Sequence, residues 1–517
     1  MGGTLRPSVS FNEEKPSNLN VEYDPIQLLG DLSGEFDGVT VPAKGTPERE
    51  EMEKKLKFKI DMTIMPVVIA MYILNYLDRN NIAAAKLGTL REDLNLTDTN
   101  YSTCVSILFV GYILMQIPSN LLLEKLGRPS LYLPLAMAIW GVLSACTAAV
   151  QGFGGLFAVR FLIGFAEAVF YPGVMFYLSC WYTKYEIAKR SAIFVTGSWV
   201  SGAFSGLIAY GIMKNMDGAR GLEAWRWLFL IEGVITVAVA LVSIFILPEL
   251  PATTKWLSKE ERLLGVIRMI EDVGQADDDH APKLDANGEP VVEDLHGKFK
   301  TAMEGFILAS KDFKVCIAFF MMFFLAVTAG VNTVFPSIVK SLGYGTEETY
   351  LLTAPPWILV AITSVLNSYH SDYKQERYFH FLWGPTLSLV GFVIGIATTK
   401  TAPRYVAMML LLQVYNSWSL GYAWLASIIP RPPIKRAAAV ACVNIGGNIP
   451  NIFVPYIYYS KASPHYYAGF AVCIATALLG LVSATVLKIR LNALNKKLAA
   501  GGIVDGLDGS TGFRFLS

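Results

Sequence analysis

The chain has 517 residues, of which 53% are hydrophobic and only 16% are charged, against roughly 25% charged residues in an average soluble domain. This composition argues against a soluble enzyme. The 43 Lys and Arg residues balance 42 Asp and Glu residues, and a net charge of +1 gives no basic surface for nucleic acid. The six cysteines stand singly in or beside apolar stretches, and no nucleophile–base pairing, phosphate loop or metal motif is recognisable. We therefore expect no enzymatic activity, no cofactor and no metal.

Apolar stretches long enough to cross about 30 Å of hydrocarbon recur along the chain, and each predicts a helix because irregular backbone cannot face lipid. Residues 1–57 are polar and lack an apolar run near Met1, which predicts a disordered cytoplasmic tail and not a signal peptide. The sequence thus predicts an all-α polytopic membrane protein with twelve spans: 62–85, 101–123, 130–150, 155–179, 188–213, 226–247, 313–339, 350–369, 379–399, 404–429, 437–459 and 466–488.

The spans divide into two six-helix halves, 58–247 and 313–490, which are joined by a polar loop over 248–312. In this loop Ser258-Lys-Glu-Glu261 has the pattern of a capping box and predicts a short amphipathic helix that ends near Asp272.

Lys and Arg residues set the predicted orientation. With the N-terminus inside, the inner segments carry more than twice as many of these residues as the outer loops, which places both termini, including the tail 491–517, in the cytoplasm. The candidate glycosylation sites Asn95 and Asn100 then lie in the first outer loop. Since no sorting signal is recognisable, the plasma membrane is the expected location.

Charged residues occur well inside the spans of the first half, whereas the cores of the second-half spans contain no Asp, Glu, Lys or Arg between their ends. A charge near the centre of a span costs at least about 2.5 to 3.5 kcal/mol, so it indicates a partner or a function. Four of these residues, Asp78, Arg79, Arg160 and Glu167, are together neutral when the two carboxylates are ionised and positive when they are protonated, so an anion should bind best to the protonated form. By linkage, the anion then favours proton uptake. The residues in question are Asp78, Arg79, Arg160, Glu167 and, nearer the outer end of its span, Glu232.

Arg79 and Arg160 are predicted to bind a substrate carboxylate, because a guanidinium stays charged and its donors match a carboxylate. Asp78 and Glu167 would accept the coupling protons. Arg160 and Glu167 are two helical turns apart and share one face of their helix. The alternative is structural: two buried ion pairs, Asp78–Arg79 and Arg160–Glu167, would hold the first half together.

Two further residues were assigned roles from their neighbours in the sequence. Glu232 lies within about 9 Å of Arg226 along the helix axis, close to the outer end of its span, which favours a structural role. Asn448 stands in Gly446-Gly447-Asn448-Ile-Pro450, where glycines and a proline weaken a helix, and we expect it to hydrogen-bond the substrate. Alternatively, Asn448 satisfies a neighbouring helix.

A polar pattern recurs at one cytoplasmic turn of each half. A small polar residue is followed four positions later by an acid and then by a base. We expect these turns to latch the halves together in an outward-open state and to release when the halves rock. Simple solvated turns are the alternative. The pattern consists of Asn120, Glu124 and Arg128 in the first half, and of Ser368, Asp372 and Arg377 in the second.

The repeated turn resembles the signature loop of the major facilitator superfamily, with Asn120 and Ser368 where that family has glycine. Four further motifs resemble the anion:cation symporter family, in particular its fungal allantoate, nicotinate, pantothenate and biotin permeases. These motifs are Tyr76-Leu-Asp78-Arg79-Asn-Asn-Ile82, Ile117-Pro-Ser-Asn120-Leu-Leu-Leu123, Arg160-Phe-Leu-Ile-Gly164-Phe-Ala-Glu167 and Trp225-Arg226-Trp-Leu-Phe-Leu-Ile-Glu232-Gly233.

The resemblance covers about residues 55–490 and implies proton-driven uptake of small organic acids. It supports substrate binding by Arg79 and Arg160 and proton coupling by Asp78 and Glu167, and it adds Tyr76 as a cavity residue.

The sequence as a whole predicts a secondary active transporter that imports a small organic anion together with protons by alternating access. Its partners would be that anion, protons and membrane lipids, and we expect a monomer. Two alternatives stay open. One is an exporter of a small acidic metabolite, although no proline lies between Gly197 and Gly211, where drug exporters of the superfamily usually have one. The other is a nutrient sensor that has lost transport, against which the intramembrane charges argue.

Overall fold

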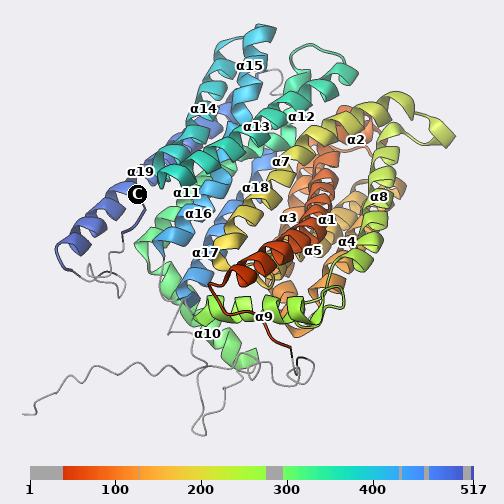
Figure 1. Cartoon of the computed structure of the whole chain (residues 1–517). Helices are drawn as coiled ribbons and strands as arrows, with labels where there is room; N and C mark the ends of the chain where they lie inside the picture. The colour runs from red at the N-terminus through yellow and green to blue at the C-terminus, as the bar shows by residue number, and fades with distance from the viewer. Residues whose placement is uncertain are drawn as a thin grey trace, which may run out of the picture.

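The computed structural model describes residues 36, 39–126, 128–274, 295–429, 433–458, 465–502, 504 and 514–516. The secondary-structure elements within these residues are helices, which are arranged as two bundles side by side (Figure 1). The first bundle consists of α1 (Pro47–Leu87), α2 (Leu90–Asp93), α3 (Asp98–Leu126), α4 (Pro129–Cys146), α5 (Phe153–Glu167), α6 (Phe170–Ser179), α7 (Lys184–Asn215) and α8 (Ala224–Ile246). The second consists of α11 (Phe313–Ala329), α12 (Phe335–Lys340), α13 (Thr346–Lys374), α14 (Tyr378–Ala397), α15 (Thr401–Leu411), α16 (Asn416–Ile428), α17 (Pro433–Asn448), α18 (Pro450–Phe453) and α19 (Tyr467–Ala499).

Ten of the helical segments are long and apolar enough to cross a membrane, and they confirm a multi-pass membrane protein. The two other predicted spans are helical as well, but they are not among the ten. Span 101–123 is α3, and span 404–429 is α15 and α16, separated by a 3-10 turn at Leu412–Tyr415. The count of twelve spans and the orientation of the termini therefore stay predictions.

The first helix begins earlier than the sequence predicted. Instead of a disordered segment up to residue 57, α1 starts at Pro47, since the Thr46 hydroxyl caps the helix by accepting a hydrogen bond from the Arg49 N–H at 3.3 Å. At the other end of the chain, α19 continues to Ala499, beyond the boundary at residue 490 that we predicted.

The loop between the bundles contains the predicted amphipathic helix, α9 (Lys259–Gly274), and a second helix that was not predicted, α10 (Leu295–Ser310). The capping box is present. The Glu261 N–H donates to the Ser258 hydroxyl at 3.2 Å, and the Ser258 N–H donates to the Glu261 carboxylate at 3.1 Å.

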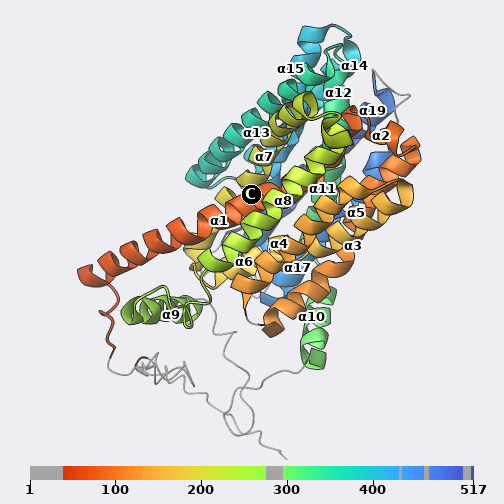
Figure 2. The ribbon, with the colours of Figure 1, turned by 90° about the vertical axis from the view of Figure 1, so that its right-hand side faces the viewer.

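Ion pairs attach α9 to the first bundle, where it lies beside the start of α1 (Figure 2). Arg268 on α9 is buried and lies 2.5 Å from Glu186 at the start of α7. Burial raises the pKa of the Glu186 carboxyl, but Arg268, the Thr183 N–H and Lys57 outweigh that effect and hold this pKa below its ordinary value. Lys59 on α1 pairs with Glu261 at 2.5 Å. The loop helix is thus held by charges on two helices of one bundle.

Close helix contacts in the first bundle depend on glycine. Gly164 on α5 lies so near α3 that a Cβ atom there would collide with the backbone carbonyl of Leu108. Gly154, on the same helix, has no such neighbour within 4 Å. The register of α3 against α5 is therefore set by the missing side chain at Gly164.

Replacing Gly164 with Ala should lower the thermal stability of the purified protein, because overpacking a close contact costs about 1 to 3 kcal/mol. The matched control Gly154→Ala should leave the melting temperature unchanged or slightly higher. Equal melting temperatures for the two variants, measured in the same detergent, would contradict the contact.

Candidate functional site

A cavity lies between the two bundles, with a volume of about 130 Å³ for the centres of water molecules; the space free of atoms, open solvent included, is about 1030 Å³. Four predicted substrate-binding residues line it together: Tyr76 and Arg79 from α1, Arg160 from α5 and Asn448 from α17. The structure therefore brings these four residues to one chamber. Asp78 and Glu167, predicted to accept protons, are buried outside the lining.

Arg79 forms an ion pair with Glu167 across two helices. The Arg79 Nε atom lies 2.5 Å from the Glu167 carboxylate, whose side chain is fully buried and whose other oxygen has no hydrogen-bond partner. The Arg79 guanidinium also lies over the rings of Tyr76 and Tyr112, at 5.3 and 4.9 Å from their centroids. Arg79 is therefore held at the cavity wall by charge and by aromatic faces.

Arg160 is the contrasting case. It is 2% exposed, yet within the described part of the chain no carboxylate lies within 4 Å of its guanidinium. Its Nη1 atom donates to the backbone carbonyl of Asp78 at 3.4 Å, and its Nε atom has no hydrogen-bond partner. The cavity wall thus carries a buried positive charge that a carbonyl dipole offsets only in part.

Asp78 accepts hydrogen bonds from neutral donors. The Ser144 hydroxyl on α4 lies 2.6 Å from one of its oxygens, and the Thr236 hydroxyl on α8 lies 3.3 Å from the other. Neither ion pair of the structural alternative, Asp78–Arg79 or Arg160–Glu167, is present, and one different pair, Arg79–Glu167, replaces them. Asp78 and Arg79 are adjacent in sequence and point to different sides of α1, whereas Arg160 and Glu167 share a face of α5 but are about 10 Å apart along its axis.

Glu232 also has a different neighbour from the one predicted. Arg226 is engaged elsewhere, by Glu223 at 2.5 Å and by the carbonyl of Val150 at 2.8 Å. Glu232 instead accepts a hydrogen bond from the Asn81 amide on α1 at 2.5 Å. Glu232 thus contacts α1 and not Arg226, and the structural role that the sequence favours for it stays a prediction.

Aromatic side chains from both bundles form another part of the lining. The ring centroid of Trp199 on α7 lies 4.7 Å from that of Tyr415, and the ring centroid of Trp357 on α13 lies 5.3 Å from that of Tyr415. Trp418 completes the group. Trp199 and Trp357 could not be recognised from the sequence, because an aromatic residue in an apolar span produces the same pattern whether its side chain faces lipid or a cavity.

Asn448 stands at the break that the sequence predicted between α17 and α18, just before Pro450. Its amide donates to the backbone carbonyl of Asn444 at 2.8 Å, one turn earlier. The side chain lines the cavity, and its role in binding stays a prediction.

The two bundles are joined by polar contacts at the end where α1 finishes and α13 begins. If the termini are cytoplasmic, this is the outer end, and the structure is closed there. The contacts are the Tyr350 hydroxyl to the Ala84 carbonyl at 2.9 Å, the Ser102 hydroxyl to the Pro455 carbonyl at 3.0 Å and the Lys214–Glu347 ion pair at 2.9 Å.

The two polar turns that we predicted to latch the halves lie at the opposite end of the bundles from these contacts. There Asp372 pairs with Arg377 of its own turn at 2.6 Å, and Arg128 is exposed before α4. The side chains of Asn120 and Glu124 lie outside the described part of the structure. Because the latch was predicted for an outward-open state, it stays a prediction.

The two candidate glycosylation sites lie near the outer end. Asn95 is exposed in the turn after α2, with a φ of 50°, and Asn100 belongs to the first turn of α3. Their modification stays a prediction.

Two helical bundles that enclose a charged cavity define a membrane transporter, and the comparisons with known proteins agree. A family model described as Major Facilitator Superfamily matches residues 68–455. The chain is 33% identical over 459 residues to the MFS-type transporter cnsO of Penicillium expansum, covering 86% of this chain and 84% of that protein. It is 32% identical over 402 residues to a protein of Agrobacterium vitis that carries the provisional name of tartrate transporter, covering 77% and 86%.

Solved structures show the same fold. The structure of a bacterial homologue of the human lysosomal transporter Spinster, in an inward-facing and unoccupied conformation, matches with a TM-score of 0.61 at 15% identity, covering 87% of this chain and 97% of that chain. A D-xylose-proton symporter matches with a TM-score of 0.59 at 16% identity, covering 82% and 97%.

The chain belongs to the Major Facilitator Superfamily. It is a multi-pass membrane protein and a secondary transporter, and its relatives are transporters and not enzymes.

Replacing Tyr350 with Phe should weaken the closed end, because the Ala84 carbonyl then loses its partner at a cost of about 1 to 3 kcal/mol. Spin labels at the outer ends of α7 and α13 should report a larger population of long distances. The control Tyr369→Phe, at a site 73% exposed, should not change the distances. Identical distributions in wild type and Tyr350→Phe would contradict the role of this contact.

Proposed function

We propose that this protein is a proton-coupled importer of a small organic anion, of the anion:cation symporter type, which works by alternating access. The observation that carries the proposal is the Arg160 guanidinium, which is buried in the cavity wall without a carboxylate partner among the described residues. A buried charge of this kind is costly unless a ligand of opposite charge compensates it. A substrate carboxylate supplies that charge and matches the donors of the guanidinium.

Proton coupling follows from the neighbouring ion pair. Arg79 is bound to Glu167, so Glu167 and a substrate carboxylate compete for the same guanidinium. Protonation of Glu167 removes its charge and frees Arg79 to join Arg160 at the substrate. Since the free energy of coupling is reciprocal, a bound anion in turn favours the protonated form of Glu167. Asp78, whose backbone carbonyl contacts Arg160, is the second proton acceptor.

The rest of the cavity supports an organic substrate over an inorganic anion. The aromatic rings of Trp199, Trp357 and Tyr415 offer apolar contact, and Asn448 offers an amide. The relative named as a tartrate transporter is consistent with an organic acid. We place the protein in the plasma membrane with both termini in the cytoplasm. The cavity would then open to the cytoplasm in this conformation, the state in which an importer releases its substrate.

Replacing Arg160 with Lys should raise the substrate concentration needed for half-maximal uptake by about tenfold or more, equivalent to about 1.4 kcal/mol, because a lysine keeps the charge but loses the paired donors. Uptake can be measured with labelled nicotinate, allantoate, pantothenate, biotin and tartrate in cells that express the protein. The control is Arg220→Lys in an exposed outer loop. Unchanged uptake by Arg160→Lys would rule out carboxylate binding at this residue.

Replacing Glu167 with Gln should abolish accumulation against a gradient while exchange of the anion across the membrane continues, because Gln holds no exchangeable proton and no longer competes for Arg79. Proteoliposomes with and without an imposed pH gradient provide the measurement. The control Glu51→Gln, at an exposed position on α1, should accumulate normally. Accumulation that survives in Glu167→Gln would disprove the coupling role, and loss of folded protein would favour a structural ion pair.

A further inference from the structure

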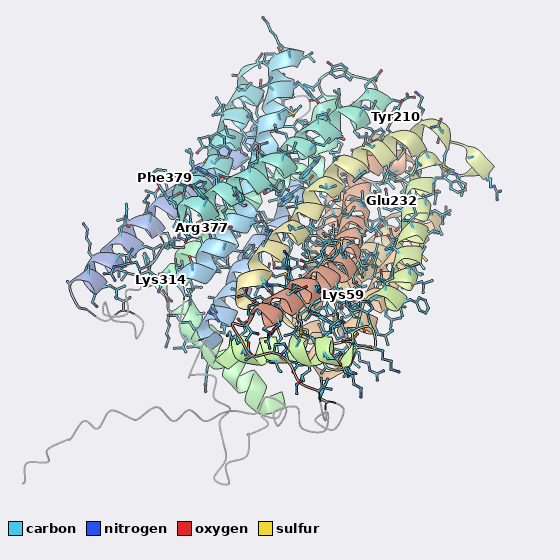
Figure 3. All side chains as sticks on the ribbon, in the orientation of Figure 1. Lys59, Tyr210, Glu232, Lys314, Arg377 and Phe379 are labelled. Carbon is cyan, nitrogen blue, oxygen red and sulfur yellow. The ribbon has the colours of Figure 1, made fainter. Side chains whose placement is uncertain are left out.

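Two more carboxylates are buried in the first bundle, behind the cavity wall. Asp78 on α1 is 1% exposed and Glu232 on α8 is 2% exposed. Figure 3 places Glu232 among the helices of this bundle, between its two ends. The proposed mechanism uses Asp78 but assigns no task to Glu232.

The two carboxylates are connected by a reciprocal pair of hydrogen bonds between α1 and α8. Asp78 on α1 accepts from Thr236 on α8 at 3.3 Å, and Glu232 on α8 accepts from Asn81 on α1 at 2.5 Å. Asp78 and Asn81 are three residues apart, about 4.5 Å along the helix axis. The two hydrogen bonds therefore lie about one helical turn apart along α1, and each carboxylate is held by a neutral donor of the opposite helix.

Neither carboxylate has a cation of its own. Within the described residues no Lys or Arg nitrogen lies within 4 Å of either group, and one oxygen of Glu232 has no hydrogen-bond partner at all. This distinguishes the pair from Glu167, which Arg79 neutralises directly. Two uncompensated negative charges so close together in a low-dielectric interior would be strongly unfavourable.

The charged and titratable groups around the pair are few. Arg160 on α5 contacts the Asp78 carbonyl and is the cation nearest to the pair, while Arg226 is engaged by Glu223. From α3, the Tyr101 hydroxyl donates to the Ile82 carbonyl at 3.3 Å, and Cys104 is buried nearby. The apolar parts of α4 and α7 contain no charged residue. Glu167 on α5 also interacts electrostatically with Asp78 and Arg160, but Arg79 neutralises it. The net charge near the pair is therefore that of Arg160 and the two acids.

We propose that Asp78 and Glu232 share one proton in the empty transporter, and that an anion bound at Arg160 brings in a second. With one shared proton, the group of Arg160 and the two acids is neutral. Arg79 and Glu167 add no net charge to this count while their ion pair is intact. A carboxylate bound at Arg160 then makes the group negative, and a second proton on Asp78 and Glu232 restores neutrality. The pair thus carries one proton for each monovalent anion. This inference rests on the proposed function, in which Asp78 accepts this proton, and it lets Glu232 share that role with Asp78.

The test compares Asp78→Asn, Glu232→Gln and the double variant. Each purified protein is titrated in weakly buffered solution near pH 7 with the monocarboxylate, chosen from nicotinate, allantoate, pantothenate and biotin, that stabilises the wild type most. Protons taken up per anion bound are counted. Either acid alone can accept the incoming proton, so each single variant should take up as many protons as wild type, whatever its transport rate. The double variant should take up one fewer.

A purely structural Glu232 gives a different pattern. Proton uptake per anion would then be reduced in Asp78→Asn by as much as in the double variant. Glu232→Gln would not change proton uptake, either alone or combined with Asp78→Asn. That result would overturn the sharing of a proton. If the wild type binds none of the four anions, or binds one without taking up protons, the proposed function itself fails.

A second measurement needs neither a substrate nor the double variant. The infrared spectrum of the empty wild type near pH 7 should contain the C=O band of a buried carboxylic acid. This band should disappear in Asp78→Asn and in Glu232→Gln, because each variant leaves one acid, whose negative charge balances the charge of Arg160. Both variants must still elute as folded protein. Survival of the band in either folded variant would show that the two residues do not share the proton.

Discussion

The cost of keeping guanidinium charges inside a low-dielectric bundle is the constraint on which this structure depends. Arg79 meets it by pairing with Glu167, whereas Arg160 is stabilised by a backbone carbonyl and by an open cavity. Of the two guanidinium groups at the cavity, that of Arg79 is therefore bound to a carboxylate, and that of Arg160 is available for a ligand. Because both charged residues that line the cavity belong to the first bundle, the chemistry of the site is concentrated on one side of the cavity.

The second bundle contributes to the cavity in another way. It supplies aromatic rings and neutral amides, such as Trp357, Tyr415 and Asn448, and it closes one end against the first bundle through contacts such as Tyr350 to Ala84. A ligand between the bundles would touch charges on one side and neutral groups on the other. A ligand that contacts both sides can stabilise one arrangement of the bundles over the other, and this differential binding is what alternating access requires.

Sequence reasoning identified the charged residues but not their partners. Asp78, Arg79, Arg160 and Glu167 were recognisable because a charge in an apolar span is costly. Their pairing was not, since Glu167 shares a helix face with Arg160 yet binds Arg79 on another helix. The same limit applies to Glu232, which the sequence placed beside Arg226 and which contacts Asn81 across α1 and α8.

Hydropathy and charge are properties of each residue wherever it lies. They are therefore enough to predict a chain that crosses a membrane many times in two halves, with charged residues well inside the spans of the first half. Which acid neutralises which base, and that Trp199 and Trp357 face the cavity, can be read only from the folded chain. These features depend on the rotation and register of each helix against its neighbours. Close contacts such as Gly164 against the Leu108 carbonyl fix that register. The hydropathy pattern of the sequence alone is compatible with several such arrangements.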